Sequence, residues 1–250
     1  MEFKKEFSDN LEKAKKLVFF TGAGISAESG ISTFRGKDGI WNKMKPEELA
    51  NFNAFMKNPD LVWQWYQHRR DIVHNTEPNA GHYSIAALEK FYEVSVVTQN
   101  IDNLHRRAGS TKIYELHGNI ERNFCVDCKT FFDLNELEPS DGVPHCKKCG
   151  GLVRPDVVWF GEYLPQDQFS GGETAAEWSD ICFVVGTSAV VYPAAYIPMS
   201  AKRAGAFLVE INIEPTELST HADYSLFGKS GEILPEILKL VNKIKSGGNL

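Results

Sequence analysis

The chain has 250 residues, of which 42% are hydrophobic and 24% are charged, and this ordinary globular composition excludes an intrinsically disordered protein. Its 27 Lys and Arg residues are outnumbered by 33 Asp and Glu residues, so the formal net charge of −6 argues against direct nucleic-acid binding through a basic surface. The length suits one large domain with a small satellite. The first residues mix acids and bases without an apolar core, so we expect no secretory signal and a cytoplasmic protein.

The chain begins with an amphipathic pattern that predicts a helix over residues 3–16. Short apolar runs, rich in β-branched or aromatic residues, predict strands over 17–20, 93–97, 181–185 and 207–211. Helical patterns lie between them, for instance over 81–91 and 194–204. Strand alternating with helix predicts an α/β protein whose parallel sheet is covered on both faces.

Two segments, residues 36–79 and 119–155, do not fit this alternation, and we interpret them as insertions into the parallel-sheet domain. A third segment, residues 181–201, is uncharged and long enough to be considered as a membrane span. It is interrupted by Gly186 and by Pro193 and Pro198, which suits a buried strand followed by a loop. We therefore expect no membrane partner.

Four of the five cysteines form two closely spaced pairs, Cys125-x2-Cys128 and Cys146-x2-Cys149, which are separated by 17 residues. Each pair can hold one side of a tetrahedral ion, and four thiolates select zinc in a closed, structural site. Chance thiols or disulfides are the alternative. The fifth cysteine, Cys182, lies in an apolar strand pattern and is interpreted as a buried, inert thiol.

A glycine-rich segment, Gly22-Ala23-Gly24-Ile25-Ser26, follows the first predicted strand. Glycines here let the backbone turn tightly and approach a phosphate at the start of a helix, although an ordinary strand-to-helix turn also uses glycine. The third glycine of the dehydrogenase fingerprint is absent, because position 27 is Ala27. The segment therefore does not indicate a hydride-transfer enzyme.

Polar residues follow the second predicted strand, in the segment Thr98-Gln99-Asn100-Ile101-Asp102. The carboxyl end of a parallel strand faces the ligand crevice, and these amides and the carboxylate suit a sugar or a carboxamide. An Asx-type turn is the alternative. A single histidine, His117, lies beside Gly118 before the cysteine pairs, where it is either a general base or a structural residue.

Taken in order, these motifs closely resemble the sirtuin family of NAD-dependent protein lysine deacylases. The resemblance extends from about residue 12 to residue 240 and rests on Gly22–Ser26, Phe34-Arg35-Gly36, Thr98–Asp102, Leu116-His117-Gly118-Asn119, the two cysteine pairs, Val158-Trp159-Phe160-Gly161-Glu162 and Gly186-Thr187-Ser188. It implies a Rossmann-like domain made of residues 1–35, 80–118 and 156–250. Residues 36–79 and 119–155 would form a small domain, built from a helical module and a zinc ribbon that binds one structural zinc.

The resemblance also implies the reaction. NAD is a co-substrate that is consumed, an acyl-lysine protein or peptide is the substrate, and His117 acts as a base on a ribose hydroxyl. The products are nicotinamide, O-acyl-ADP-ribose and free lysine. A mono-ADP-ribosyltransferase that uses the same NAD pocket is the first alternative, and a zinc-ribbon binding module without enzymatic activity is the second.

The resemblance places the site residues in three groups. The catalytic residues are His117, Asn100 and Asp102. NAD would contact Gly22, Ala23, Gly24, Ile25, Ser26, Thr33, Phe34, Arg35, Trp41, Gln99, Asn100, Ile101, Asp102, Gly186, Thr187, Ser188, Asn212, Ile213, Glu214 and Ser230. The substrate would contact Tyr66, Arg69, Val158, Trp159, Phe160 and Gly161, with residues 158–161 resembling the strand that pairs with the substrate backbone.

Two details depart from or refine this resemblance. The family often has Pro-Asp where this chain has Ser32-Thr33, and the change frees the backbone and removes a carboxylate.

Tyr66 and Arg69 are three residues apart and hence on one helix face, where they can bind a carboxylate. The pair resembles the Tyr-x-x-Arg pair of sirtuins that remove succinyl and malonyl groups, although helix packing of Tyr66 is the alternative.

Overall fold

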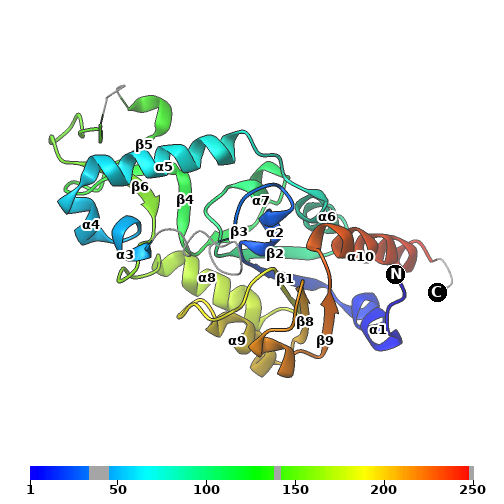
Figure 1. Ribbon diagram of the computed structural model, residues 1–250. Helices are drawn as coiled ribbons and strands as arrows, with labels where there is room; N and C mark the ends of the chain where they lie inside the picture. The colour runs from blue at the N-terminus through cyan, green and yellow to red at the C-terminus, as the bar shows by residue number, and fades with distance from the viewer. Residues whose placement is uncertain (34–44, 138–141, 248–250) are drawn as a thin grey trace.

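The structure, a computed structural model, describes residues 1–33, 45–137 and 142–247. Its larger part is a six-stranded parallel sheet in the order β3-β2-β1-β7-β8-β9 (Figure 1). The strands are β1 (Lys16–Thr21), β2 (Glu93–Thr98), β3 (Ile113–Glu115), β7 (Ile181–Val185), β8 (Phe207–Asn212) and β9 (Tyr224–Phe227). The predicted α/β class with a parallel sheet is therefore confirmed.

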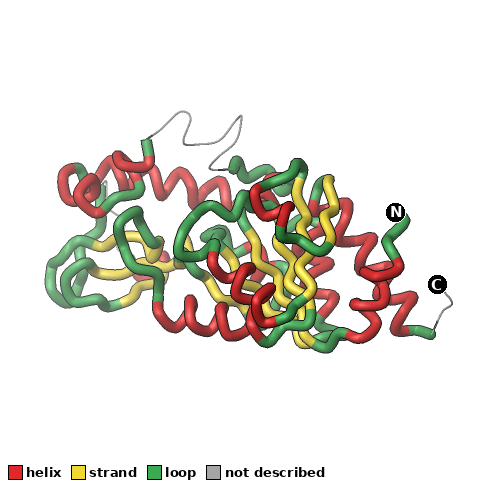
Figure 2. The backbone as a smooth tube through the Cα atoms, turned by 90° about the horizontal axis from the view of Figure 1, so that it is seen from below, coloured by secondary structure: helices red, strands yellow, loops and turns green. Residues whose placement is uncertain are grey.

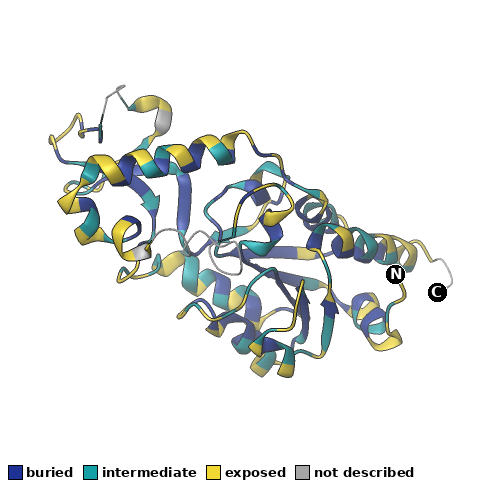
Figure 3. Ribbon diagram, viewed as in Figure 1, coloured by how far each residue is buried: buried dark blue, intermediate teal, exposed yellow. Residues whose placement is uncertain are grey.

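Helices cover both faces of this sheet, because successive strand residues point to opposite sides. Phe19 and Phe183 belong to the core under one face, whereas their neighbours Phe20 and Val184 belong to the core under the other. The first core is closed by α1 (Lys5–Lys13), α6 (Ala80–Leu88) and α10 (Ser230–Lys245), and the second by α8 (Gln166–Glu177) and α9 (Tyr196–Ala204). Figure 3 shows the strands buried between helices whose outer sides are exposed.

The smaller part combines short helices with a second sheet, beyond the carboxyl ends of the large-sheet strands (Figures 1 and 2). Its antiparallel strands run in the order β5-β4-β6, with β4 (Gly118–Cys125), β5 (Phe131–Asp133) and β6 (Val153–Val157). The helices are α3 (Pro46–Leu49), α4 (Phe52–Lys57) and α5 (Pro59–His74). Asn58 caps α5, since its side chain accepts the backbone N–H of Leu61, and Pro59 suits the first helical position.

The two inserted segments share one core, which contains Phe55, Trp63 and Tyr66 from the helices and Ile120 and Trp159 from the sheet side. Two further helices are short: α2 (Gly24–Ala27) follows β1, and α7 (Leu104–Arg107) follows β2. Short 3-10 turns occur at Leu134–Glu136 and Glu217–Thr220. None of the helices in the described residues is long and apolar enough to cross a membrane.

Candidate functional site

The order of the large sheet places its ligand crevice beside β1. The chain leaves β1 toward β2 and β3 on one side and returns to β7, β8 and β9 on the other. In open parallel sheets of this kind, ligands bind at the carboxyl ends of the strands where the order reverses. The segments that begin at Gly22, Gln99 and Gly186 all follow strands that end there.

The glycine-rich segment after β1 packs directly against the segment after β7. The Gly22 N–H donates to the Val185 carbonyl at 3.0 Å, and the Gly24 N–H donates to the Gly186 carbonyl at 2.8 Å. A Cβ atom at Gly22 would lie 2.6 Å from Cβ of Thr187, and one at Gly24 would lie 2.7 Å from Cα of Gly186. Glycine is therefore required at both positions by the close approach of two backbones.

Asn100 and Asp102 meet at the hydroxyl of Ser26. The Asn100 amide donates to the Gly22 carbonyl at 3.1 Å and to Ser26 Oγ at 3.2 Å. Ser26 in turn donates to the Asp102 carboxylate at 2.7 Å, and burial raises the pKa of Asp102. The structure thus joins two of the predicted catalytic residues to the glycine-rich segment.

His117 is held by a backbone carbonyl at the same edge of the sheet. Its Nδ1 lies 2.8 Å from the carbonyl oxygen of Gln99. A carbonyl can only accept, so Nδ1 carries the proton and Nε2 carries the lone pair of the neutral ring. His117 is half-buried, and this tautomer is the one that a general base requires.

The segments after β7 and β8 extend the network in the other direction. The side chain of Gln99 donates to Thr187 Oγ1 at 3.0 Å, and that of Asn212 donates to the Thr187 carbonyl at 3.1 Å. Ser188, Ile213 and Glu214 are exposed beside them. These residues form a continuous edge along the carboxyl ends of β2, β1, β7 and β8.

The other predicted NAD contacts are distributed as follows. Ser230 is buried at the start of α10, where its hydroxyl donates to Glu28 at 3.3 Å. Ala23 and Ile101 are half-buried and Ile25 is buried in the segments already described. Thr33 ends a described segment, and the predicted contacts Phe34, Arg35 and Trp41 lie outside the described residues.

Two buried histidines behind this site were missed by sequence reasoning. His82 Nε2 lies 3.5 Å from Ser26 Oγ, and His105 Nε2 lies 3.0 Å from Thr21 Oγ1. The two rings meet edge to face at 4.9 Å between centroids. Burial lowers the pKa of His82 to about 4 and that of His105 well below its ordinary value. The only available signal was the position of His105 three residues after Asp102, which has no motif of its own.

Tyr66 and Arg69 lie on the inner face of α5. Tyr66 Oη accepts a hydrogen bond from Trp159 Nε1 at 2.8 Å, and both side chains are in the core of the smaller part. Arg69 is also buried; burial lowers its pKa, whereas its interactions with Tyr66 and Asp102 raise it. The predicted packing role of Tyr66 is thus present, and Arg69 is close enough to Asp102 to interact with it electrostatically.

The segment 158–161 differs from the predicted strand. β6 ends at Val157, and the next residues form a turn in which Gly161 has φ of +89°. Their N–H groups are used within the chain: Val158 donates to the His117 carbonyl at 3.0 Å and Phe160 to the Ala50 carbonyl at 2.9 Å. The turn leaves Phe160 46% exposed, whereas Trp159 is buried, so only the former can offer its side chain to a substrate.

An ion pair between a buried arginine and a half-buried glutamate fixes this turn. Arg154 donates to Glu162 at 2.5 and 3.0 Å, and its guanidinium lies 3.3 Å from the centroid of the Trp159 ring. Glu162 also accepts the N–H of Trp159 at 2.8 Å. These contacts explain why the backbone turns here instead of continuing β6.

The four paired cysteines converge at the end of the small sheet. Their Sγ atoms all lie within 4.8 Å of one another, with Cys125 and Cys149 separated by 3.5 Å and Cys128 and Cys146 by 3.6 Å. A disulfide requires about 2.05 Å, whereas four sulfurs at about 2.3 Å from a tetrahedral zinc are about 3.8 Å apart. The donor set therefore fits one zinc, and no protein ligand besides the thiolates is needed. Cys182 is fully buried, and burial raises its pKa to about 12, as expected for an inert thiol.

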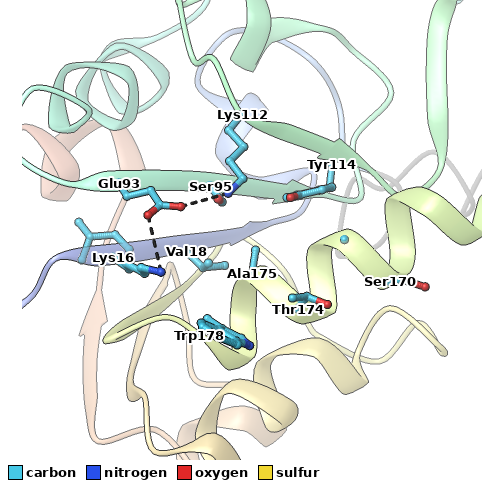
Figure 4. Close-up of a pocket in the computed structure, with 12 residues that line it drawn as sticks. Lys16, Val18, Glu93, Ser95, Lys112, Tyr114, Ser170, Thr174, Ala175 and Trp178 are labelled. Atoms are coloured by element: carbon cyan, nitrogen blue, oxygen red, sulfur yellow. Dashed lines mark hydrogen bonds and ion pairs between the residues drawn. The ribbon is translucent and has the colours of Figure 1, made fainter.

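A pocket of about 490 Å³ lies at the opposite end of the large sheet, between α8 and the start of β1, β2 and β3 (Figure 4). Glu93 is paired there with Lys112 at 3.2 Å and with Lys16 at 3.7 Å, and Lys16 lies over the Trp178 ring. None of the motif residues lines this pocket. This pocket lies at the amino ends of the strands, whereas the candidate site lies at their carboxyl ends, so the two are separate.

Comparison with known proteins decides the family. The profile of the Sir2 family matches residues 22–193, which include every motif that carries the resemblance; the predicted contacts Asn212, Ile213, Glu214 and Ser230 lie beyond it. The chain belongs to the Sir2 family. Sir2 proteins are the sirtuins, so the resemblance in the sequence is confirmed.

Curated relatives match nearly the whole chain. The NAD-dependent protein deacylase 2 of Pyrobaculum aerophilum is 52% identical over 94% of this chain and 95% of its own length. The NAD-dependent protein deacylase of Pyrococcus furiosus is 49% identical over 96% and 98%. The NAD-dependent protein deacylase 1 of Archaeoglobus fulgidus is 47% identical over 94% and 97%.

Solved Sir2 structures share the fold. A mutant Sir2 homologue in complex with ADP-ribose has a TM-score of 0.95 and 44% identity, and the match covers 99% of this chain and 100% of that chain. A Sir2 homologue–NAD complex has a TM-score of 0.90 and 44% identity, with 98% and 95% covered. A Sir2–p53 peptide–NAD+ complex has a TM-score of 0.86 and 35% identity, with 95% and 98% covered.

Proposed function

We propose that this chain is an NAD-dependent protein lysine deacylase. The observation that carries the proposal is the fixed tautomer of His117, whose Nδ1 donates to the Gln99 carbonyl beside the cluster of Asn100, Ser26 and Asp102. Membership of the Sir2 family and the names of the curated relatives support the same activity. The ADP-ribosyltransferase alternative is not favoured, since these relatives are named deacylases.

The large sheet binds NAD along its carboxyl edge. NAD supplies the ADP-ribose that accepts the acyl group. Nicotinamide leaves the ribose, and hydrolysis by one water molecule then releases free lysine and O-acyl-ADP-ribose. The Gly22–Ser26 backbone contacts the pyrophosphate, and Asn100 and Asp102 orient the nicotinamide half. Thr187 and Asn212, which are hydrogen-bonded to each other, contact the adenosine half.

His117 acts as the general base through Nε2. The Gln99 carbonyl keeps the proton on Nδ1, so the lone pair of Nε2 is held in one direction toward a ribose hydroxyl. When Nε2 takes the proton of the ribose hydroxyl, the hydroxyl oxygen becomes a stronger nucleophile toward the acyl carbon. Without the imidazole this step would depend on water, and the rate would fall by roughly two to four orders of magnitude.

The acyl-lysine peptide binds beside the turn at residues 158–161. Phe160 is exposed there, and the Arg154–Glu162 ion pair keeps the turn rigid. The p53 peptide in a solved Sir2 complex supports a peptide as the second substrate. Because the N–H groups of Val158, Trp159 and Phe160 donate within the chain, pairing with the substrate backbone would use carbonyl groups of this turn, and such main-chain recognition would make selectivity among peptide sequences loose.

The acyl group is selected by Tyr66 and Arg69. Arg69 supplies a buried guanidinium that can pair with a succinyl or malonyl carboxylate, and Tyr66 Oη, which accepts from Trp159, can still donate its own proton. We therefore propose that acidic acyl groups are removed as well as acetyl groups. This subgroup assignment rests on the two side chains alone.

The zinc site has a structural role. Cys125, Cys128, Cys146 and Cys149 would hold one Zn²⁺ with four thiolates, a closed set that gives folding free energy to the small sheet. We propose that the smaller domain comprises residues 36–79 and 119–155 and the larger one residues 1–35, 80–118 and 156–250, as the resemblance implies. Because four thiolates would close its coordination shell, this zinc would offer no open position to a substrate and would take no part in the reaction.

Product analysis tests the activity. The zinc-loaded chain is incubated with NAD and an acyl-lysine peptide, and the products are weighed by mass spectrometry. Nicotinamide, deacylated peptide and O-acyl-ADP-ribose in equal amounts support a deacylase. ADP-ribose attached to protein would instead support the transferase.

A further inference from the structure

A chain of buried hydrogen bonds connects His105 with the backbone of Asn100. His105 lies on α7 and is 3% exposed, with Nε2 3.0 Å from Thr21 Oγ1. Thr21 donates to Thr98 Oγ1 at 2.9 Å, and Thr98 Oγ1 accepts the N–H of Asn100 at 3.0 Å. The two threonines face each other in the register of β1 and β2, at the last position of each strand.

The donors in this series of hydrogen bonds converge on Thr98 Oγ1, which accepts from both the Thr21 hydroxyl and the Asn100 N–H. A threonine hydroxyl has one proton, and that of Thr21 goes to Thr98, so His105 Nε2 must donate to Thr21. His105 Nδ1 then carries a lone pair, and it is a buried atom without a hydrogen-bond partner among the described residues. A side chain that only filled this space would be apolar, as the neighbouring Leu104 is, because a buried polar atom without a partner lowers stability.

Together with the backbone, these hydrogen bonds form a closed ring of Thr21, Thr98, Asn100 and Gly22. Thr21 is followed by Gly22, whose carbonyl accepts the side-chain amide of Asn100. On the other side, the Asp102 carboxylate accepts the N–H of Leu104, the residue before His105. Movement of His105 would therefore change the position of both predicted catalytic groups relative to the glycine-rich segment.

We propose that His105 is a positioning residue: through two buried threonine hydroxyls it fixes the turn that carries Asn100 against the segment after β1. It touches neither NAD nor the peptide, and it acts only through Thr21 and Thr98. This inference rests on the proposed function, since it assigns Asn100 to the NAD pocket. Loss of the His105 side chain should therefore weaken the binding of NAD and leave the binding of the acyl-lysine peptide unchanged.

Three variants test the chain of hydrogen bonds. His105→Leu removes the donor and keeps an apolar side chain, whereas His105→Gln places an amide donor near the position of Nε2. Thr98→Val keeps the shape of the side chain and removes the acceptor of the Asn100 N–H. Ser179→Ala is the matched control, because it removes a buried hydroxyl hydrogen bond of 2.7 Å just before β7, at the opposite end of that strand.

Calorimetric titration with NAD and steady-state kinetics, both corrected for the fraction of folded protein, give the readout. We expect His105→Leu and Thr98→Val each to weaken NAD binding about tenfold, the two together to be far less than additive, and His105→Gln to restore most of the loss. The dissociation constant of the acyl-lysine peptide and the NAD affinity of Ser179→Ala should stay at the wild-type values.

Wild-type NAD affinity in both His105→Leu and Thr98→Val would overturn the proposal, as would equal damage by His105→Gln and His105→Leu. Fully additive losses would also contradict it, because they would mean that the two residues act separately. A wild-type chain that binds NAD but removes no acyl group would instead contradict the proposed function. The binding measurements would still decide the role of His105 in that case.

Discussion

Acid should destabilise this protein through the buried histidine His82. Burial lowers its folded-state pKa to about 4, whereas a histidine in an unfolded chain titrates near about 6.5. Above the unfolded value neither state binds the proton, so the full stability is present. As the pH falls between these two values, the unfolded chain takes up a proton that the folded protein excludes, and stability decreases with decreasing pH.

The size of this loss follows from the two pKa values. Between pH 8 and pH 5 it amounts to about 2 kcal/mol, and it approaches about 3 kcal/mol below pH 4. The folded state also disfavours the charged form because Nδ1 of His82 accepts the N–H of Asn79 at 3.3 Å, and a proton on that atom would face another donor. His105 contributes with the same sign, since its pKa is lowered as well.

Urea unfolding at pH 8 and pH 5 measures the effect. In His82→Gln, which cannot titrate, the difference in unfolding free energy between the two pH values should shrink by about 2 kcal/mol. The same exchange at His74, which is exposed at the end of α5, serves as the control. An unchanged difference in His82→Gln would refute the buried, neutral state of this ring.

Four further predictions concern the site. His117→Ala should lower deacylation by about two to four orders of magnitude and leave NAD binding intact, so retained turnover in a single-turnover assay would rule out its role as base. Gly24→Ala should weaken NAD binding by about tenfold or more in calorimetry, because its Cβ would lie 2.7 Å from Gly186; wild-type affinity would contradict this packing. Removal of zinc by a chelator, or Cys125→Ala, should unfold the small sheet in circular dichroism, and elemental analysis should find about one zinc per chain; a stable, metal-free protein would count against the site. Arg69→Met should lower desuccinylation about tenfold to a hundredfold and change deacetylation little, whereas equal losses on both peptides would show that Arg69 is structural.

The predicted sheet agrees closely with the structure because its strands are buried on both faces. The apolar run at 181–185 has the same bounds as β7, and the runs predicted at 17–20, 93–97 and 207–211 extend by one or two residues in β1, β2 and β8. Such strands have continuous apolar sequences that end at glycine or polar residues. The edge strands β3 and β9 are short and only partly buried, so they leave no comparable pattern.

The cysteine pairs and the glycine-rich segment were predictable because their chemistry depends on spacing within short stretches of sequence. His82 and His105 were not, since their partners Ser26 and Thr21 are 56 and 84 residues away in the chain. Only the packing of α6 and α7 behind β1 brings these groups together. A single histidine in a sequence carries no signal of this kind.

The turn after β6 shows how a long-range contact overrides a local pattern. Residues 158–161 were expected to be a strand, but the ion pair between Arg154 and Glu162 and the donation of Val158 to His117 turn the backbone there. The Tyr66–Arg69 spacing predicted that both residues lie on one face of a helix, and the structure buries both side chains on α5. The hydrogen bond between Trp159 and Tyr66 and the electrostatic interaction of Arg69 with Asp102 could not be predicted from that spacing.

Isotope tracing in the products is the most direct test of the central claim that the acyl group passes from lysine to ADP-ribose at His117. The chain is incubated with NAD and a peptide whose lysine carries a ¹³C-labelled acetyl group, and the products are analysed by mass spectrometry. The account predicts that the label leaves the peptide and appears in O-acetyl-ADP-ribose, with one nicotinamide released per peptide, and that His117→Ala abolishes this transfer. Label that stays on the peptide while NAD is consumed, or that appears only as free acetate without acetyl-ADP-ribose at early times, would contradict it.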